Sequence, residues 1–155
     1  MPLKLEFLQQ YIKNAFPGSI VAKCKEESCS LNLRGIPHRI IVKGERVCDD
    51  KICDCIIFSE TTEGIKVCAV ELKSKRLHAR DIPEKFCNCA HTAFNIFKNC
   101  NIEAPIPFFL VLHKGTKSSE HQVLSRKRVN FNGKDYPIRI RRCGSSLSNL
   151  FEELK

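Results

Sequence analysis

Residues 53–73 read CDCIIFSETTEGIKVCAVELK, and this stretch predicts an antiparallel β-hairpin. Two apolar runs rich in Ile, Val and Cys flank a polar turn that contains Gly64, which is the usual sequence pattern of a hairpin. Because side chains alternate along a strand, Glu71 and Lys73 share one face near the end of the second strand. A carboxylate and an ammonium on an otherwise apolar strand cost desolvation energy, so their presence needs a reason. A functional site is one interpretation, and a surface ion pair at a strand end is the alternative.

The apolar pattern outside this hairpin predicts further helices and strands. Helices are expected at residues 3–16, about 81–99, 118–128, and from 145 or 146 to 154. Asp81 and Glu84 are expected to form a capping box at the start of the second helix. Further strands are expected at 19–24, 29–34, 39–42, 107–113, 129–131 and 136–142. A meander followed by alternating helices and strands predicts an α/β (mixed α+β) fold, in which helices cover both faces of a mixed central sheet.

The chain has 155 residues, which suits a single domain over residues 1–155. No apolar run approaches the roughly 18 residues that a transmembrane helix needs, so no membrane partner is expected. Residues 1–13 alternate polar and apolar side chains as an amphipathic helix does, and they do not resemble a signal peptide. We therefore expect a cytoplasmic protein.

Basic residues are concentrated in the last third of the chain. The formal net charge is +9, and residues 114–142 hold nine Lys or Arg against Glu120 and Asp135. Such a stretch favours a polyanionic partner, with nucleic acid ahead of an anionic membrane, although an ordinary solvated face is the alternative. The predicted nucleic-acid contacts are Lys114, Lys117, Arg126, Lys127, Arg128, Arg139, Arg141 and Arg142.

The ten cysteines are expected to be reduced and buried, because a chain of this length does not need disulfides to stabilise its core. Cys53, Cys55 and Cys68 should pack in the core on the sheet face opposite Asp54 and Glu71. Zinc binding is a weak alternative, since neither Cys87-Asn88-Cys89 nor the pairs Cys24/Cys29 and Cys48/Cys53 have zinc-ligand spacing. A cysteine protease would pair a cysteine with one of the five histidines, but no local signature supports it.

The hairpin also places a second carboxylate near Glu71. Asp54 opens the first strand, and a short hairpin offset brings it close to Glu71 on the neighbouring strand. Two converging carboxylates must share a proton or a cation, and a hard divalent ion such as Mg²⁺ resolves their repulsion. Lys73 could then orient or activate an attacking water and balance charge on a phosphate.

This arrangement resembles the PD-(D/E)xK nuclease superfamily. The residues that carry the resemblance are Asp54 followed by CIIF, and Ala69-Val70-Glu71-Leu72-Lys73. The resemblance implies a restriction-endonuclease-like core over about residues 3–114 and a phosphodiesterase that depends on Mg²⁺ or Mn²⁺. It implies that Asp54, Glu71 and the backbone carbonyl of Leu72 are metal ligands and that Lys73 is the catalytic lysine.

The chain departs from the family pattern in the first half of the motif. Cys53 stands where the family has proline, and Asp49 and Asp50 are alternative choices for the first carboxylate. Many members add an acidic residue from near the first helix, for which Glu6, Glu26 and Glu27 are candidates. Lys85 matches a position where some members carry an accessory polar residue. The cysteine arrangement of the iron–sulfur members is not met.

We therefore expect an endonuclease that hydrolyses DNA, in preference to RNA. A homodimer that makes paired cuts is a natural assembly for a chain with one active site. The first alternative is a catalytically inactive module that keeps the fold and binds nucleic acid within a larger complex. A structural protein held by a metal is a second alternative.

Overall fold

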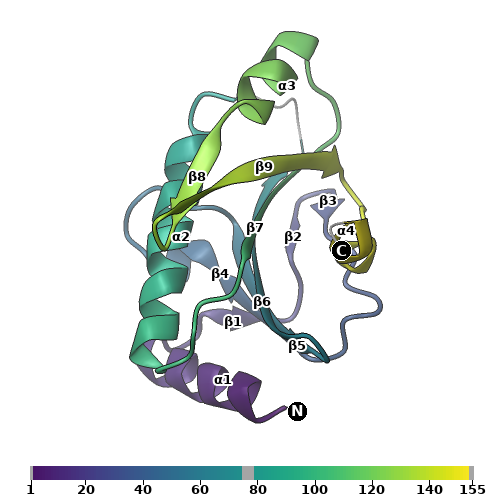
Figure 1. The fold of residues 1–155 in the computed structure, drawn as a ribbon. Coiled ribbons are helices and arrows are strands. Elements are labelled where there is room, and N and C mark those ends of the chain that lie inside the picture. Colours follow the sequence, from purple (N-terminus) through teal and green to yellow (C-terminus); the bar gives the residue numbers. More distant parts are fainter. Residues whose placement is uncertain (1, 75–78, 154–155) are drawn as a thin grey trace.

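The computed structural model describes residues 2–74 and 79–153. Its main sheet has seven strands in the order β1-β4-β5-β6-β7-β9-β8 (Figure 1). The strands are β1 (Ile20–Val21), β4 (Arg39–Lys43), β5 (Cys55–Thr61), β6 (Gly64–Lys73), β7 (Pro107–His113), β8 (Arg128–Phe131) and β9 (Lys134–Arg142). The helices are α1 (Leu3–Ala15), α2 (Ile82–Asn99), α3 (Ser118–Ser125) and α4 (Leu147–Glu153), with a 3₁₀ turn at Gly44–Arg46. The expected α/β class with a mixed sheet is confirmed.

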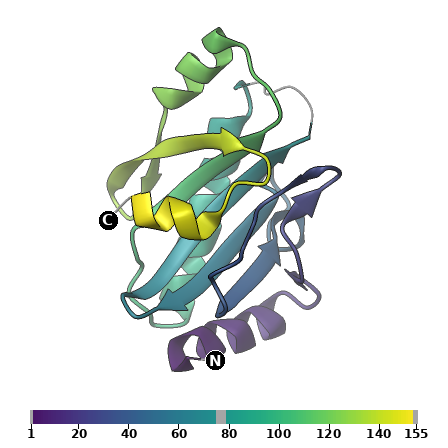
Figure 2. The ribbon, with the colours of Figure 1, turned by 90° about the vertical axis from the view of Figure 1, so that its right-hand side faces the viewer.

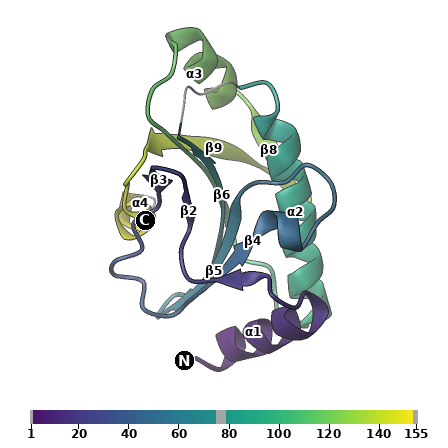
Figure 3. The same ribbon diagram turned by 180° about the vertical axis from the view of Figure 1, so that it is seen from behind.

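Two apolar clusters cover the two faces of this sheet. Helices α1 and α2 pack on one face, where Phe58, Phe86, Phe97 and Phe109 are buried. On the other face lie α4 and a small separate hairpin of β2 (Lys25–Glu26) and β3 (Cys29–Ser30), as Figures 2 and 3 show. Helices therefore flank both faces, as the sequence predicts.

The strand directions bring several strand ends to one edge of the sheet. Strands β4, β5 and β6 form an antiparallel meander, whereas β6, β7 and β9 run parallel to one another. The start of β5 and the ends of β6, β7 and β9 consequently lie at the same edge. In α/β sheets, the carboxyl ends of parallel strands are the usual place for a ligand site.

Some expected elements differ in the structure. The predicted strand 19–24 shortens to β1, and residues 29–34 contribute only β3 to a separate hairpin, because Lys25 and Glu26 pair with Ser30 and Cys29 and not with the main sheet. The predicted helix 118–128 ends at Ser125, and Arg128 already belongs to β8. Helix α4 begins at Leu147, and the predicted end at residue 154 lies outside the described residues.

The capping box predicted from Asp81 and Glu84 is wrong. Asp81 is the N-cap residue of α2, but its side chain makes no capping hydrogen bond in the described part of the chain. Its carboxylate instead lies 3.5 Å from Lys51 Nζ. Pro83 occupies the first turn of α2, where its missing N–H would be unpaired in any case.

The prediction that the cysteines are reduced is wrong for four of them. Cys29 is bonded to Cys143, and Cys53 to Cys89, pairs that lie 114 and 36 residues apart in the sequence. Cys53 also precedes β5 and points toward α2, so it does not share a face with Cys55 and Cys68 as expected. Cys55 and Cys68 are free, buried and part of the opposite cluster, as predicted.

Candidate active site

Asp54 lies beside Glu71 at the sheet edge. Cys55 pairs with Val70, so the preceding residue, Asp54, falls opposite Glu71 when the same register is continued. The amide of Leu72 donates a hydrogen bond of 2.7 Å to Asp54 Oδ2. The hairpin thus brings together the two carboxylates that the sequence singled out.

The segment before β5 is anchored in two directions, and this fixes the position of Asp54. The Gly44 amide donates to the Asp54 carbonyl oxygen at 2.9 Å. A Cβ atom at Gly44 would overlap the carbonyl oxygen of Cys53, so glycine permits this close approach of the two chain segments. The Cys53–Cys89 disulfide and a hydrogen bond of 2.6 Å from Asn88 to the Lys51 carbonyl tie the segment to α2.

Glu71 is a buried carboxylate held by two lysines. Its side chain is 1% exposed, and its Oε2 atom lies 3.0 Å from Lys73 Nζ and 2.6 Å from Lys85 Nζ. Lys73 comes from the same strand and Lys85 from the first turn of α2. Glu71 Oε1 is buried and has no hydrogen-bond partner among the described residues. A buried, unpaired oxygen is costly unless another group completes it.

Burial and the neighbouring charges change the protonation of Asp54 and Lys85. Burial raises the pKa of Asp54 to about 7, and the charge of Glu71 also raises it, while the hydrogen bond from the Leu72 amide lowers it. Burial alone lowers the pKa of Lys85, but the hydrogen bond and charge of Glu71, together with Asp54, raise it above its ordinary value. Lys85 therefore stays charged, whereas Asp54 exchanges its proton near neutral pH.

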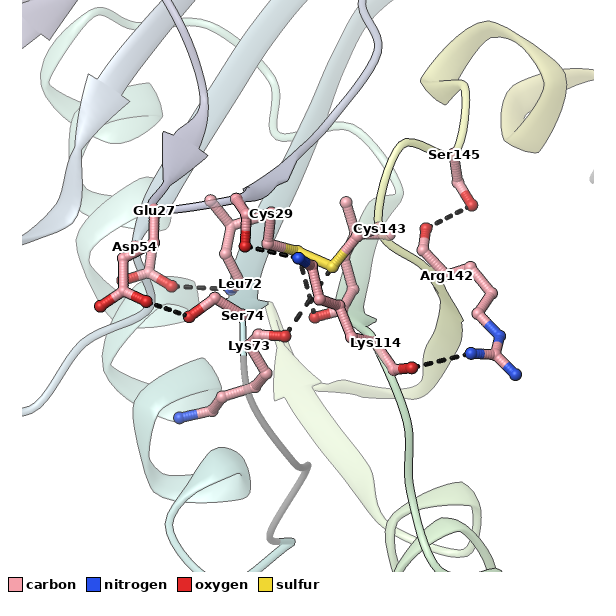
Figure 4. Close-up of a disulfide and its surroundings, with 12 residues drawn as sticks. Glu27, Cys29, Asp54, Leu72, Lys73, Ser74, Lys114, Arg142, Cys143 and Ser145 are labelled. Carbon is pink, nitrogen blue, oxygen red and sulfur yellow. Dashed lines mark hydrogen bonds between the residues drawn. A yellow bond between two sulfur atoms is a disulfide. The ribbon is translucent and has the colours of Figure 1, made fainter.

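The candidate accessory acids lie in different places. Glu26, on β2, faces Asp54 closely enough for its charge to raise the pKa of Asp54. Glu27 accepts a hydrogen bond of 2.8 Å from Ser74, just after β6 (Figure 4). Glu6 lies on α1 in a separate surface pocket with Leu3 and Phe7.

The two competing carboxylates for the first motif position, Asp49 and Asp50, are exposed and precede the strand. Within residues 2–74 and 79–153, no three His, Cys, Asp or Glu side chains are arranged to hold a metal ion. Any cation at this site would therefore be held by the pair Asp54 and Glu71, with backbone oxygens or water completing its shell.

This pair nonetheless fits a hard divalent cation. Both side chains offer oxygen atoms, which Mg²⁺ and Mn²⁺ prefer, and Mg²⁺ commonly takes only one or two protein carboxylates. Glu71 Oε1 is buried without a partner among the described residues, and burial first and the charge of Glu71 second raise the pKa of Asp54. The Leu72 amide is engaged with Asp54, while its carbonyl stays a predicted ligand.

His113 is a residue that the sequence reasoning missed. Its Cα pairs with Lys73 on one side, and the neighbouring residue of β9 on the other side is Arg142, so the three form one row across β6, β7 and β9. His113 is 7% exposed, and its Nδ1 atom has no hydrogen-bond partner among the described residues. The only feature of the sequence that could have pointed to His113 is its position at the end of the apolar run PFFLVLH, where a buried strand ends.

The predicted nucleic-acid contacts divide between different surfaces. Lys114 and Arg142 lie at the edge that carries the candidate site. The Lys114 carbonyl oxygen accepts a hydrogen bond of 2.8 Å from Arg142 Nη1. Arg139 and Arg141 project from β9 toward the α4 face, opposite Ile138 and Ile140, and Arg141 pairs with Glu153. Lys114 and Arg142 therefore lie beside the candidate site and Arg139 and Arg141 on another face, and the role of all four as nucleic-acid contacts stays a prediction.

The other basic residues of that segment are exposed around α3 and the start of β8. They are Lys117, Arg126, Lys127 and Arg128, of which Arg128 donates hydrogen bonds to the carbonyls of Ser125 and Lys127. These four side chains remain available to a partner, and their role as nucleic-acid contacts stays a prediction.

No protein-family model, curated protein or solved structure matches this chain significantly. The resemblance to the PD-(D/E)xK superfamily therefore rests on the sequence motif and stays a prediction. None of the helices in the described part of the chain has the length and apolar character needed to span a lipid bilayer.

Proposed function

We propose that the protein is a divalent-metal-dependent endonuclease that hydrolyses phosphodiester bonds, with DNA as the preferred substrate. The observation that carries this proposal is the convergence of Asp54 and Glu71 at a sheet edge beside Lys73 and Lys85. The element order α1, β4-β5-β6 meander, α2 and β7 is also the order expected from the superfamily resemblance.

In this proposal Asp54 and Glu71 hold Mg²⁺ or Mn²⁺, with the Leu72 carbonyl as a further ligand. When bound, the ion neutralises charge on the phosphate and increases the acidity of water. Asp54 must lose its proton to act as a ligand, and its pKa of about 7 allows this at and above neutral pH. Lys85, fixed by Glu71, positions that carboxylate.

Lys73 is the residue proposed to contact the substrate. Its side chain is 30% exposed, and its ammonium lies 3.0 Å from Glu71, so it borders both the buried carboxylate and solvent. From this position it can donate hydrogen bonds to a phosphate oxygen and stabilise the charge that develops during hydrolysis. Lys85, with 23% of its side chain exposed, is more enclosed.

One observation favours the alternative of a catalytically inactive nucleic-acid-binding module. Both lysines bind the same oxygen of Glu71, so two ammonium groups neutralise this carboxylate without a metal. Such a module would use the same edge for binding and would need a partner for any chemistry. Both proposals predict nucleic-acid binding, and only the first predicts turnover.

The deciding experiment incubates the protein with plasmid DNA, single-stranded DNA and RNA in Mg²⁺, Mn²⁺ or EDTA. Wild-type protein should cleave DNA with either metal, and Asp54→Ala and Lys73→Ala should not. Lys66→Ala is the matched control for Lys73, since Lys66 lies on the same strand but contacts Glu63 and the Phe151 ring on the other face. Asp49→Ala tests the competing carboxylate and should remain active. Intact substrates with every variant, despite binding, would establish the inactive module.

The assembly and the cellular compartment belong to the same proposal. A homodimer would supply two active sites for paired cuts, and sedimentation of the protein with and without duplex DNA tests it. The cytoplasmic location remains a prediction from the sequence. The two disulfides are an observation against it, because disulfides are rare in reducing compartments.

A further inference from the structure

Two open pockets include residues of the β2–β3 hairpin in their linings. The larger, of about 1010 Å³, lies beside the segment from Ala22 to Arg39. The smaller, of about 340 Å³, lies between the hairpin and the ends of β7 and β9. The pockets share Ser30 and Gly144, which are joined by a backbone hydrogen bond of 2.8 Å. We call the two pockets together the hairpin channel.

The lining of the hairpin channel is cationic. Six lysine or arginine residues line it, and no Asp or Glu lines it in the described part of the chain: Lys23, Lys25, Arg34 and Arg39 in the larger pocket, and Lys114 and Arg142 in the smaller. All six residues are exposed. The Arg39 guanidinium also donates a hydrogen bond of 2.7 Å to the Ile36 carbonyl, and this bond stabilises the lining of the larger pocket.

The β2–β3 hairpin separates charges of opposite sign. Lys25 lines the larger pocket, whereas the next residue, Glu26, acts on Asp54. The Cys29–Cys143 disulfide fixes the hairpin to the end of β9, with Glu27, Ser74 and Asp54 to one side and Lys114 and Arg142 to the other (Figure 4). The acidic side chains therefore lie on the other side of the disulfide from Lys114 and Arg142.

The smaller pocket contains a buried polar atom that lacks a partner. His113 lines this pocket, is only 7% exposed, and has an Nδ1 atom with no hydrogen-bond partner among the described residues. Ser28 and Lys114 lie in the same lining, and their side chains are hydrogen-bonded to each other. The Lys114 ammonium and the Ser28 hydroxyl are donors of the kind that bind phosphate oxygens.

The smaller pocket also borders the candidate active site. His113 is the strand neighbour of Lys73, and Arg142 is the strand neighbour of His113. A phosphate held by Lys114 and Arg142 would therefore lie along the same sheet edge as Asp54 and Glu71. The smaller pocket thus adjoins the larger one at Ser30 and Gly144, and through His113 it adjoins the strand end that carries Lys73.

We propose that the hairpin channel binds the sugar–phosphate backbone of a nucleic-acid strand and directs it to the Asp54–Glu71 edge. The direction of the strand rests on the proposed nuclease function, whereas binding in the channel does not. The channel lies largely outside the basic segment 114–142, because four of its six cations come from residues 23–39.

The test measures binding without cleavage. Fluorescence anisotropy in EDTA gives the Kd of a labelled oligonucleotide, as a single strand and as a duplex, over a series of salt concentrations. The channel variant is Lys23→Gln/Lys25→Gln/Arg34→Gln. The control Lys4→Gln/Lys13→Gln/Lys98→Gln removes the same charge from exposed positions on α1 and α2 outside the channel. Arg126→Gln/Lys127→Gln/Arg128→Gln tests the rival surface near α3, and Lys114→Gln tests the smaller pocket.

The channel variant should raise Kd at least about tenfold and lower the salt slope by about 2 for a single strand or about 3 for a duplex. Lys114→Gln should weaken binding in the same direction, and the control should bind like wild type with an unchanged thermal midpoint. Wild-type affinity in the channel variant, or no nucleic-acid binding by the wild type, would overturn the proposal. The oligonucleotide form, single strand or duplex, whose affinity falls more in the channel variant is the form that occupies the channel.

The same variants separate this proposal from the nuclease proposal. If the channel variant loses binding in EDTA while the wild type cleaves nothing with Mg²⁺ or Mn²⁺, the channel stands and the nuclease function fails. If the wild type cleaves and the channel variant cleaves with an unchanged KM, the nuclease function stands and the channel fails.

Discussion

The carboxylate of Asp54 accepts a hydrogen bond of 2.7 Å from the backbone amide of Leu72, which follows Glu71 on the adjacent strand. This contact fixes a residue outside β5 to a residue inside β6. It keeps Asp54 beside Glu71 although the two acids repel each other, and the repulsion and burial together raise the pKa of Asp54 to about 7. The protonation of Asp54 therefore depends on its burial and on the charge of Glu71.

The first prediction concerns stability and pH. Because the pKa of Asp54 is raised from 3.8 to about 7, the folded protein keeps a proton that the unfolded chain releases between these values. The free energy of unfolding should therefore decrease as the pH rises through this window. Asp54→Asn keeps an acceptor for the Leu72 amide and removes the titration. In EDTA near pH 8, this variant should be more stable than wild type by about 1–2 kcal/mol, allowing for solvent screening.

Urea denaturation near pH 5 and near pH 8 checks this prediction. The advantage of Asp54→Asn should shrink at the lower pH, where the wild-type carboxyl is already protonated. An equal difference at both pH values would show that Asp54 ionises in the folded protein as it does in the unfolded chain.

The second prediction concerns Mg²⁺ binding. A metal ligand must be deprotonated, so binding near pH 6.5 should release most of one proton from Asp54, and binding near pH 8.5 should release much less. Calorimetric titrations in buffers of different ionisation enthalpy measure this number directly. Asp54→Asn should abolish the pH-dependent proton release, and Asp49→Asn should not. Mg²⁺ binding with no proton release would place the ion elsewhere.

The third prediction concerns the lysines around Glu71. Glu71→Gln leaves Lys73 and Lys85 without their counter-charge, but both side chains reach solvent, so the expected loss is about 1–3 kcal/mol, below that of a fully buried pair. Lys85→Met removes one ammonium with little change of volume. A double-mutant cycle by chemical denaturation should give a coupling of about 1–2 kcal/mol between positions 71 and 85. Additive effects would contradict the ion pair.

The fourth prediction concerns the close approach at Gly44. Gly44→Ala forces a methyl group against the carbonyl oxygen of Cys53 and displaces the segment that carries Asp54. We expect a loss of about 2 kcal/mol or more in unfolding free energy and a weaker Mg²⁺ response. Gly115→Ala is the matched control, since a Cβ atom at that position would meet no neighbouring atom within 4 Å. Equal thermal midpoints for the two variants would contradict this explanation.

The fifth prediction concerns the disulfide between Cys29 and Cys143. It closes a loop over a sequence separation of 114 residues, so Cys29→Ser/Cys143→Ser should lower the free energy of unfolding by about 2–5 kcal/mol. Cys100→Ser changes a free cysteine and should have a much smaller effect. Because the Cys53–Cys89 bond stays reducible in the double variant, a reducing agent should destabilise the double variant less than it destabilises wild type. An unchanged wild type under complete reduction would contradict it.

The hairpin of Asp54, Glu71 and Lys73 could be predicted from the sequence because its determinants are local. Alternation along β6 places Glu71 and Lys73 on one face, and a short turn leaves few registers for β5. The mixed sheet, α2 and β7 were recognisable for the same reason, since their apolar patterns lie within single segments. The Lys85–Glu71 contact joins different elements, and the superfamily resemblance, not periodicity, pointed to Lys85.

The sequence by itself determined the hairpin with its carboxylates, the α/β class and the net positive charge. Only the tertiary structure decided which distant residues meet that hairpin. The order β6-β7-β9 brings His113 and Arg142 to Lys73, and the separate β2–β3 hairpin brings Glu26 toward Asp54 and the bond from Cys29 to Cys143. These contacts depend on strand order and on the packing of segments far apart in the chain, which no local periodicity encodes.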